Sequence, residues 1–152
     1  SRRQRQMCIR DRGHASQIAL GIALQKPERR VYCFDGDGAS IMHMGNMAIT
    51  ASMKCKNYVH IVFNNGAHDS VGGQPTVGLK IDFCAIAQAV GYKAAYSVET
   101  MEALEAKLAE FKNAEGPVFL QICVKKGNRK DLGRPTTTPI QNKEAFMEFL
   151  NK

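Results

Sequence analysis

The segment VYCFDGDG at residues 31–38 decides the fold. Its first four residues are apolar in succession, which predicts a β-strand buried on both faces, and the glycines around Asp37 predict a tight turn at its end. The segment VHIVFNNG at residues 59–66 has the same form. Between the two, apolar residues recur at helical spacing up to Ala51. Strand, helix and strand in this order indicate two parallel strands joined by a crossover helix.

The rest of the chain continues this alternation. We expect a helix at 16–24, a helix at 82–90 capped by Asp82 and stopped by Gly91, a strand at 94–98, a helix capped by Thr100, a buried strand at 118–124 and a last helix at 142–150. The pattern predicts one α/β domain over residues 13–152, with a parallel sheet and helices on both faces. Residues 1–12 have no periodicity, and we interpret them as a disordered or non-native basic head.

Charge and composition narrow the function. The formal net charge is +7, but the five arginines of the head account for most of it. Without Trp, and without basic residues interleaved with aromatic ones, the chain does not have the pattern of a nucleic-acid binder. It contains no apolar stretch long enough for a membrane span. The five cysteines form no CxxC pair, so we expect a reduced, cytoplasmic protein.

The two strand ends carry the chemistry. In an open parallel sheet, ligands bind beyond the carboxyl ends of the strands. Gly36 and Gly38 allow the backbone to approach a ligand closely. A helix that starts near Ala39 directs its unpaired N–H groups toward that ligand, which favours phosphate. The Asp37 carboxylate and the Asn65 amide offer the hard oxygens that suit Mg²⁺. The alternative is that both are ordinary turn residues that end two strands.

The spacing carries a family resemblance. Gly36-Asp37-Gly38, followed by 25 residues and then Asn64-Asn65, resembles the signature of thiamine diphosphate enzymes. The resemblance implies that Asp37, Asn65 and the main-chain carbonyl of Ala67 bind the metal. It further implies a cofactor-binding set made up of Gly13, His14, Gly36, Asp37, Gly38, Ala39, Ser40, Asn65 and Ala67.

Longer stretches narrow this resemblance. Residues 13–21 (GHASQIALG), 64–76 (NNGAHDSVGGQPT) and 133–139 (GRPTTTP) resemble the phosphonopyruvate decarboxylases, and the similarity extends over residues 13–152. It implies a lyase that converts 3-phosphonopyruvate into phosphonoacetaldehyde and CO₂ during phosphonate biosynthesis. The alternatives are a sulfopyruvate decarboxylase subunit, another thiamine diphosphate enzyme similar to acetolactate synthase, and a non-catalytic subunit that binds phosphate and Mg²⁺.

One part of the family's pattern is missing from this sequence. Members of the family usually carry a pyrimidine-binding domain, with the glutamate that activates the cofactor, before this one. We therefore expect a partner domain or subunit, a homo- or hetero-oligomer, and no activity from the isolated chain. The chain is either one subunit of a split enzyme or a fragment of a longer polypeptide, and the abrupt end of the head favours the fragment.

Other candidate residues lie near the expected site. His68 is a candidate for a catalytic proton donor or acceptor, or for a histidine that satisfies loop backbone groups. Arg129 and Arg134, with Lys126, are candidates for binding the phosphonate of a small anionic 2-oxo acid, or for a solvated surface loop. The segment 72–75 (GGQP) predicts a turn that could close over the ligand. We interpret His60, inside the second strand, as structural.

Overall fold

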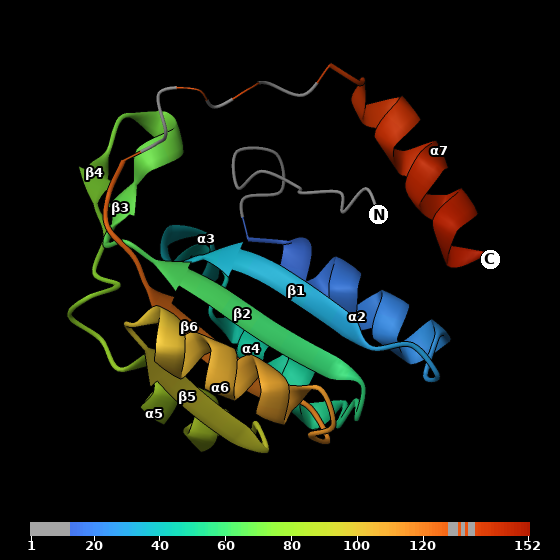
Figure 1. Ribbon diagram of the computed structural model, residues 1–152, viewed down its shortest axis with the longest axis horizontal. Helices are drawn as coiled ribbons and strands as arrows, with labels where there is room; N and C mark the ends of the chain where they lie inside the picture. The colour runs from blue at the N-terminus through green and yellow to red at the C-terminus, as the bar shows by residue number, and fades with distance from the viewer. Residues whose placement is uncertain (1–12, 128–130, 132, 134–135) are drawn as a thin grey trace.

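A four-stranded parallel sheet forms the centre of the molecule (Figure 1). The computed structural model describes residues 13–127, 131, 133 and 136–152. The strands are β1 (Val31–Gly36), β2 (Tyr58–Asn64), β5 (Ala94–Val98) and β6 (Val118–Cys123), in the order β1-β2-β6-β5. The α/β class and the parallel sheet are therefore confirmed. The predicted head, residues 1–12, lies outside the described residues.

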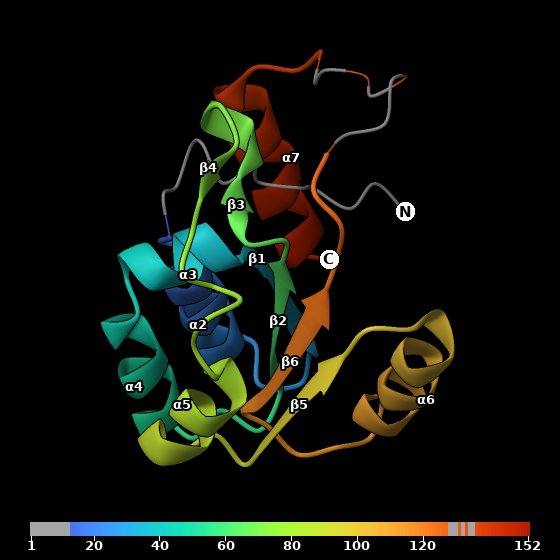
Figure 2. The ribbon, with the colours of Figure 1, turned by 90° about the vertical axis from the view of Figure 1, so that its left-hand side faces the viewer.

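Helices cover both faces of the sheet (Figure 2). The helices are α2 (Ala15–Gln25), α3 (Asp37–Met42), α4 (Gly45–Ser52), α5 (Phe83–Val90), α6 (Met101–Phe111) and α7 (Pro139–Leu150). Helices α2, α4 and α5 pack on one face, and α6 packs on the other. A small antiparallel hairpin, β3 (Ala67–His68) and β4 (Gln74–Pro75), encloses the short helix η1 (Asp69–Val71) above the carboxyl ends of β1 and β2.

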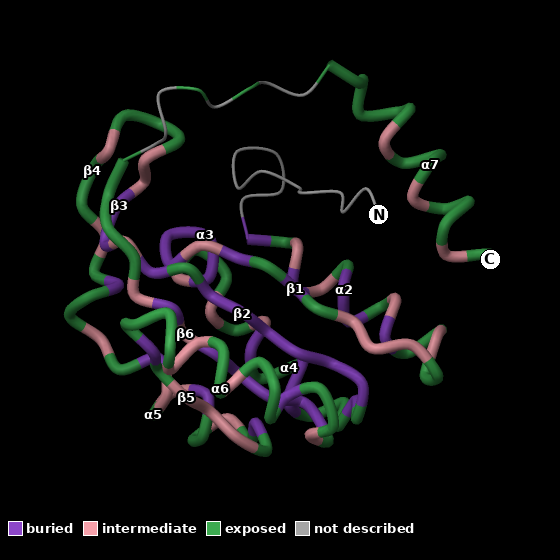
Figure 3. Tube along the Cα trace, in the orientation of Figure 1, coloured by how far each residue is buried: buried purple, intermediate pink, exposed green. Residues whose placement is uncertain are grey.

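The core is built on β2 and β6, the two inner strands. Figure 3 shows β2 buried along most of its length. On one face Val62 and Phe119 pack against Phe83 of α5, and on the other Leu120 packs with Phe111 of α6. The helices on both sides thus explain why these strands are apolar on consecutive residues.

The helix layer on the α6 face is incomplete among the described residues. Side chains of β1 and β2 point to this face, and Tyr32, Phe34 and Phe63 are between 39% and 47% exposed. The rings of Phe34 and Phe63 stack with their centroids 6.0 Å apart. The outer face of β1 therefore presents aromatic surface, while its inner face is buried.

Local capping chemistry behaves as the sequence predicts. The side chains of Asp82 and Thr100 accept hydrogen bonds from the backbone N–H groups of Ala85 and Ala103, at the starts of α5 and α6. Gly91 ends α5 in the left-handed conformation, with φ of 103°. These helix boundaries are fixed by a few neighbouring residues, which is why sequence alone locates them.

Three elements differ from expectation. The helix expected from residue 39 to 51 begins at Asp37 and divides into α3 and α4, because His43 leaves the helical region (φ −132°, ψ 47°) and Gly45 favours a helix weakly. Within the segment 72–75, only the two glycines form the turn, since Gln74–Pro75 is strand β4. The last helix begins at Pro139, because Thr138 and Gln141 form a capping box.

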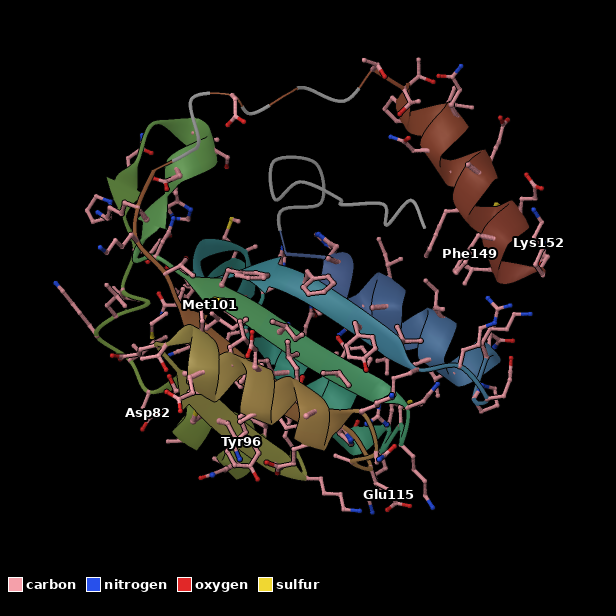
Figure 4. All side chains as sticks on the ribbon, viewed as in Figure 1. Asp82, Tyr96, Met101, Glu115, Phe149 and Lys152 are labelled. Atoms are coloured by element: carbon pink, nitrogen blue, oxygen red, sulfur yellow. The ribbon has the colours of Figure 1, made fainter. Side chains whose placement is uncertain are left out.

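Helix α7 lies beside α2. The Arg29 guanidinium donates to the carbonyl of Phe149, 3.1 Å away, and lies 5.5 Å from the centre of its ring. Figure 4 shows Phe149 and Lys152 at the C-terminal end of this helix. No helix in the described part of the chain is both long and apolar enough to cross a membrane.

Phe119 tests the core assignment. Its ring is fully buried between His60, Phe83 and Tyr92. Phe119→Ala should lower the free energy of unfolding by about 3–5 kcal/mol, because it leaves a cavity in the inner layer. Urea denaturation followed by circular dichroism measures this loss. Phe34→Ala, on the exposed face, serves as the control and should cost about 1 kcal/mol. Equal losses at the two positions would contradict the layer assignment.

Candidate functional site

The ends of β1 and β2 bring the predicted site residues to one edge of the sheet. Gly36 is the register partner of Phe63, so the residues that follow each strand emerge side by side. Asp37 begins α3 directly after β1, and Asn65 follows the last residue of β2. We call residues 64–68 the metal loop. The topology thus places the two side chains singled out by the sequence at the same end of neighbouring strands.

The Asp37 carboxylate is buried, with 2% of the residue exposed. Its Oδ2 accepts a hydrogen bond from the hydroxyl of Thr76. A Cβ added at Gly78 would collide with the same oxygen, so only glycine fits there. Among the described residues, no Lys, Arg or His forms an ion pair with Asp37. A buried carboxylate without a cation is costly, and a bound cation would remove that cost.

Asn65 offers a second oxygen. Its Oδ1 accepts from the backbone N–H of Ala67 at 3.0 Å, and its Nδ2 donates to Oδ2 of Asp69 at 2.8 Å. Ala67 is buried and contributes its carbonyl to the same loop. In the described residues no three His, Cys, Asp or Glu side chains form a group that could hold a metal. One carboxylate with neutral oxygens fits Mg²⁺ that also takes oxygens from phosphate.

The first asparagine of the pair has a structural role. Asn64 is fully buried, its Nδ2 donates to the carbonyl of Gly78 at 2.7 Å, and its Oδ1 accepts from the N–H of Gly66 at 3.1 Å. The N–H of Thr76 also donates to the carbonyl of Gly66, 2.9 Å away. Asn64 therefore holds residues 76–78 across the carboxyl end of β2, where they close over Asp37.

The backbone beside Asp37 is suited to an anion. The residues that precede α2 and α3, His14 and Gly36, make no side-chain hydrogen bond that caps the helix, and the same is true before α4. By contrast, α5, α6 and α7 each have a side-chain cap. The first N–H groups of an uncapped helix are available to a ligand. Gly13 has a φ of +96°, and a Cβ there would collide with the carbonyl of Ala39. The start of α2 therefore packs directly against α3.

A buried polar chain supports α3 from below. Asp35 accepts from the N–H of Gly36 at 3.0 Å and from the hydroxyl of Ser40 at 3.2 Å. Its Oδ2 lies 3.6 Å from Nε2 of His60, and the other ring nitrogen lies 3.2 Å from the hydroxyl of Tyr92. Burial raises the pKa of the Tyr92 hydroxyl well above its ordinary value, so this group stays neutral. The hydroxyl of Ser40 is thus engaged on the core side of α3.

The four histidines lie in three places. A Cβ added at Gly38 would collide with the His68 ring, so this ring lies against the first turn of α3. His14 is exposed, and its ring centre lies 4.3 Å from that of His43. His60 is buried inside the sheet layer, as the sequence predicts. Arg129 and Arg134 lie outside the described residues, and Lys126 is exposed just after β6.

Sequence reasoning missed several residues that complete this site. Thr76 and Gly78 contact Asp37, Asp35 supports α3, and Asp69 contacts Asn65. Only Asp35 carries a sequence signal, as an acidic residue at the end of an apolar strand. The others approach the site through tertiary contacts or through a turn without periodicity.

The comparison with known proteins decides the family. Residues 10–122 match the profile described as thiamine pyrophosphate enzyme, C-terminal TPP binding domain. The chain belongs to the thiamine pyrophosphate enzyme family. The phosphonopyruvate decarboxylase of Streptomyces viridochromogenes is 36% identical over 91% of this chain and 34% of its own length. The chain therefore spans about a third of that member of the family.

A second relative and one solved structure are also similar to this chain. The sulfopyruvate decarboxylase subunit beta of Methanocaldococcus jannaschii is 33% identical over 92% of this chain and 73% of its own length. The thiamine diphosphate-dependent 4-hydroxybenzoylformate decarboxylase of Rhodococcus jostii RHA1 shares the fold, with a TM-score of 0.66 and 22% identity over 77% of this chain and 24% of that one. Regions similar to this chain thus occur both within a longer chain and in a shorter subunit.

A substitution at Gly78 tests whether the position of the Asp37 carboxylate determines metal binding. In Gly78→Ala the new methyl group displaces the carboxylate, and the affinity for Mg²⁺ in the presence of thiamine diphosphate should fall about tenfold or more. Isothermal titration calorimetry measures this affinity. The matched control is Gly45→Ala, because a Cβ at Gly45 meets no atom within 4 Å. Unchanged Mg²⁺ binding in folded Gly78→Ala would show that Asp37 does not hold the metal.

Proposed function

We propose that this chain supplies the diphosphate- and Mg²⁺-binding half of a thiamine diphosphate-dependent decarboxylase that converts 3-phosphonopyruvate into phosphonoacetaldehyde and CO₂. The observation that carries the proposal is the buried Asp37 carboxylate, which has no cation partner among the described residues and belongs to the uncapped first turn of α3. A magnesium ion bound to a diphosphate satisfies both the carboxylate and the helix N–H groups.

The proposed ligands follow from this arrangement. Asp37, the Oδ1 of Asn65 and the carbonyl of Ala67 hold the metal. The N–H groups at the first turn of α3 hold the diphosphate. The proposed cofactor-binding set also includes Gly13 and His14 at the start of α2, and Gly36, Gly38, Ala39 and Ser40 at the start of α3. Ser40 supports this set from the core side, because its hydroxyl donates to Asp35 below α3.

The chain's own residues prepare the site for the reaction. When bound, thiamine diphosphate supplies the electron sink for loss of CO₂. Residues 76–78 shield the Asp37 carboxylate from water, because the Thr76 hydroxyl donates to it and the N–H of Gly78 donates to Thr76. The His68 ring lies against Gly38, where it can hold or transfer a proton beside the diphosphate turn. We therefore propose His68 as the catalytic proton carrier of this half of the site.

The substrate assignment rests on similarity and charge. A 3-phosphonopyruvate molecule carries a carboxylate and a phosphonate, which Arg129, Arg134 and Lys126 would bind. The relative from Streptomyces viridochromogenes is named as a phosphonopyruvate decarboxylase, which supports phosphonopyruvate as the substrate. A role in phosphonate biosynthesis is part of the proposal and follows from that substrate. Sulfopyruvate is the second candidate, favoured by the large share of the Methanocaldococcus jannaschii subunit that this chain covers.

A partner completes the proposed enzyme. The chain spans 34% of the Streptomyces relative, and another relative is named as a subunit, so we infer a pyrimidine-binding domain or subunit that carries the activating glutamate. The complete enzyme is then a homo- or hetero-oligomer. The four cysteines in the described part of the chain form no disulfide, which supports a reduced, cytoplasmic compartment.

Reconstitution tests this function. The purified chain alone should release no CO₂ from 3-phosphonopyruvate, because the activating glutamate lies in the partner. With the pyrimidine-binding partner, thiamine diphosphate and Mg²⁺, turnover of 3-phosphonopyruvate should exceed that of sulfopyruvate and pyruvate in a coupled aldehyde assay. Asp37→Asn should abolish this turnover, while Asp82→Asn, at a helix cap far along the chain, serves as the matched control.

Each alternative gives a different result. Turnover by the chain alone would contradict the division of the site. A preference for sulfopyruvate or pyruvate would replace the substrate assignment, with pyruvate pointing to an enzyme similar to acetolactate synthase. A reconstituted pair that binds no thiamine diphosphate would leave the non-catalytic phosphate- and Mg²⁺-binding subunit as the function.

A further inference from the structure

The Asp69 side chain joins two segments that are distant in sequence. Its Oδ2 accepts from Nδ2 of Asn65 and from the backbone N–H of Gly127, at 2.8 Å in both cases. Asp69 lies within η1, but His68 occupies the cap position of that helix and no side chain caps it. The carboxylate therefore does not cap η1. It accepts hydrogen bonds from the metal loop and from the segment after β6 instead.

This contact determines how the Asn65 amide is turned. A carboxylate can only accept hydrogen bonds and a backbone N–H can only donate one. Asp69 on one side therefore requires the amide NH₂ group, and the N–H of Ala67 on the other side requires the amide oxygen. Rotating the amide by 180° would set two acceptors against each other and two donors against each other. Asp69 thus fixes Oδ1 on the side of Ala67.

The same carboxylate oxygen holds a basic segment at the metal loop. Residues 124–127, which we call the basic segment, carry Lys125 and Lys126 and are exposed. Val124 donates its N–H to the carbonyl of Asn64 at 2.9 Å, and Gly127 donates to Asp69. Both ends of the basic segment are therefore tied to the region of the metal loop. Without the hydrogen bond from Gly127, the bond from Val124 to Asn64 would be the one that remains of these two.

We propose that Asp69 is a positioning residue of the metal site, which orients the Asn65 amide oxygen toward the metal and anchors the basic segment beside it. The inference rests on the proposed function, since it assumes that Asn65 is a metal ligand. Partners that orient a ligand from behind typically change metal affinity by about 10- to 100-fold when removed. Asp69 acts here as a hydrogen-bond acceptor and does not itself bind the metal.

The test uses the full chain with Mn²⁺ as a paramagnetic substitute for Mg²⁺ and thiamine diphosphate present. In Asp69→Ala, Mn²⁺ affinity from electron paramagnetic resonance should fall about tenfold or more. Hydrogen exchange of the Gly127 N–H, measured without any ligand, should accelerate about tenfold, because its charged acceptor is gone. The urea midpoint should stay close to that of Ser70→Ala, a matched control at the exposed next position in η1.

The conservative variant separates position from charge. Asp69→Asn keeps an acceptor oxygen that can receive both hydrogen bonds, so Mn²⁺ affinity should stay within about threefold of that of the unmodified chain. If Asp69→Asn loses as much affinity as Asp69→Ala, the role of Asp69 is its charge, and the positioning role is overturned. Unchanged Mn²⁺ affinity and Gly127 exchange in Asp69→Ala would also overturn it.

The two measurements separate this inference from the proposed function. If the unmodified chain binds no Mn²⁺, the proposed metal site fails, and with it the role of Asp69 toward the metal. Gly127 exchange in the ligand-free chain still reports whether Asp69 anchors the basic segment. If the unmodified chain binds Mn²⁺, and Asp69→Ala has the same Mn²⁺ affinity and the same Gly127 exchange rate, the proposed function stands and the positioning role fails.

Discussion

The Asp37 carboxylate is buried at the junction between β1 and α3. Several neighbouring residues hold it in this position. Thr76 donates to it, and Gly78 approaches too closely for any side chain to intervene. A buried negative charge of this kind is stable only when a cation or several donors compensate it. This burial favours the proposed metal site over an ordinary turn at the end of a strand.

Two layers of polar contacts support this arrangement. Below α3, Asp35 connects Gly36 and Ser40 to the buried His60. Above it, Asn64 holds residues 76–78 across the end of β2. Both layers rest on β1 and β2, whose inner faces are packed by helices, so the proposed metal and phosphate contacts are built on the central sheet. The exposed histidine pair and the basic segment lie outside this sheet.

Much of the fold could be predicted because its signals are local. Consecutive apolar residues indicated the buried strands, and Asp82, Gly91 and Thr100 marked helix boundaries through bonds within a few residues. The division between α3 and α4 at His43 and the two-residue strands β3 and β4 have no such periodicity. The contact between Thr76 and Asp37 joins residues 39 positions apart, and only tertiary structure creates it. The sequence therefore indicated the two side chains of the site but not the segment that covers them.

The central claim is that Asp37, Asn65 and Ala67 surround one metal ion. Nuclear magnetic resonance of the isotope-labelled chain, titrated with Mn²⁺ in the presence of thiamine diphosphate, tests it directly, because the unpaired electrons broaden the signals of nearby nuclei. The side-chain amide of Asn65 and the backbone N–H groups of Gly38 and Ala67 should broaden first, while those of Ala85 and Ala103 at the remote helix caps stay sharp. Broadening that begins elsewhere on the chain, or is uniform over it, would contradict the account.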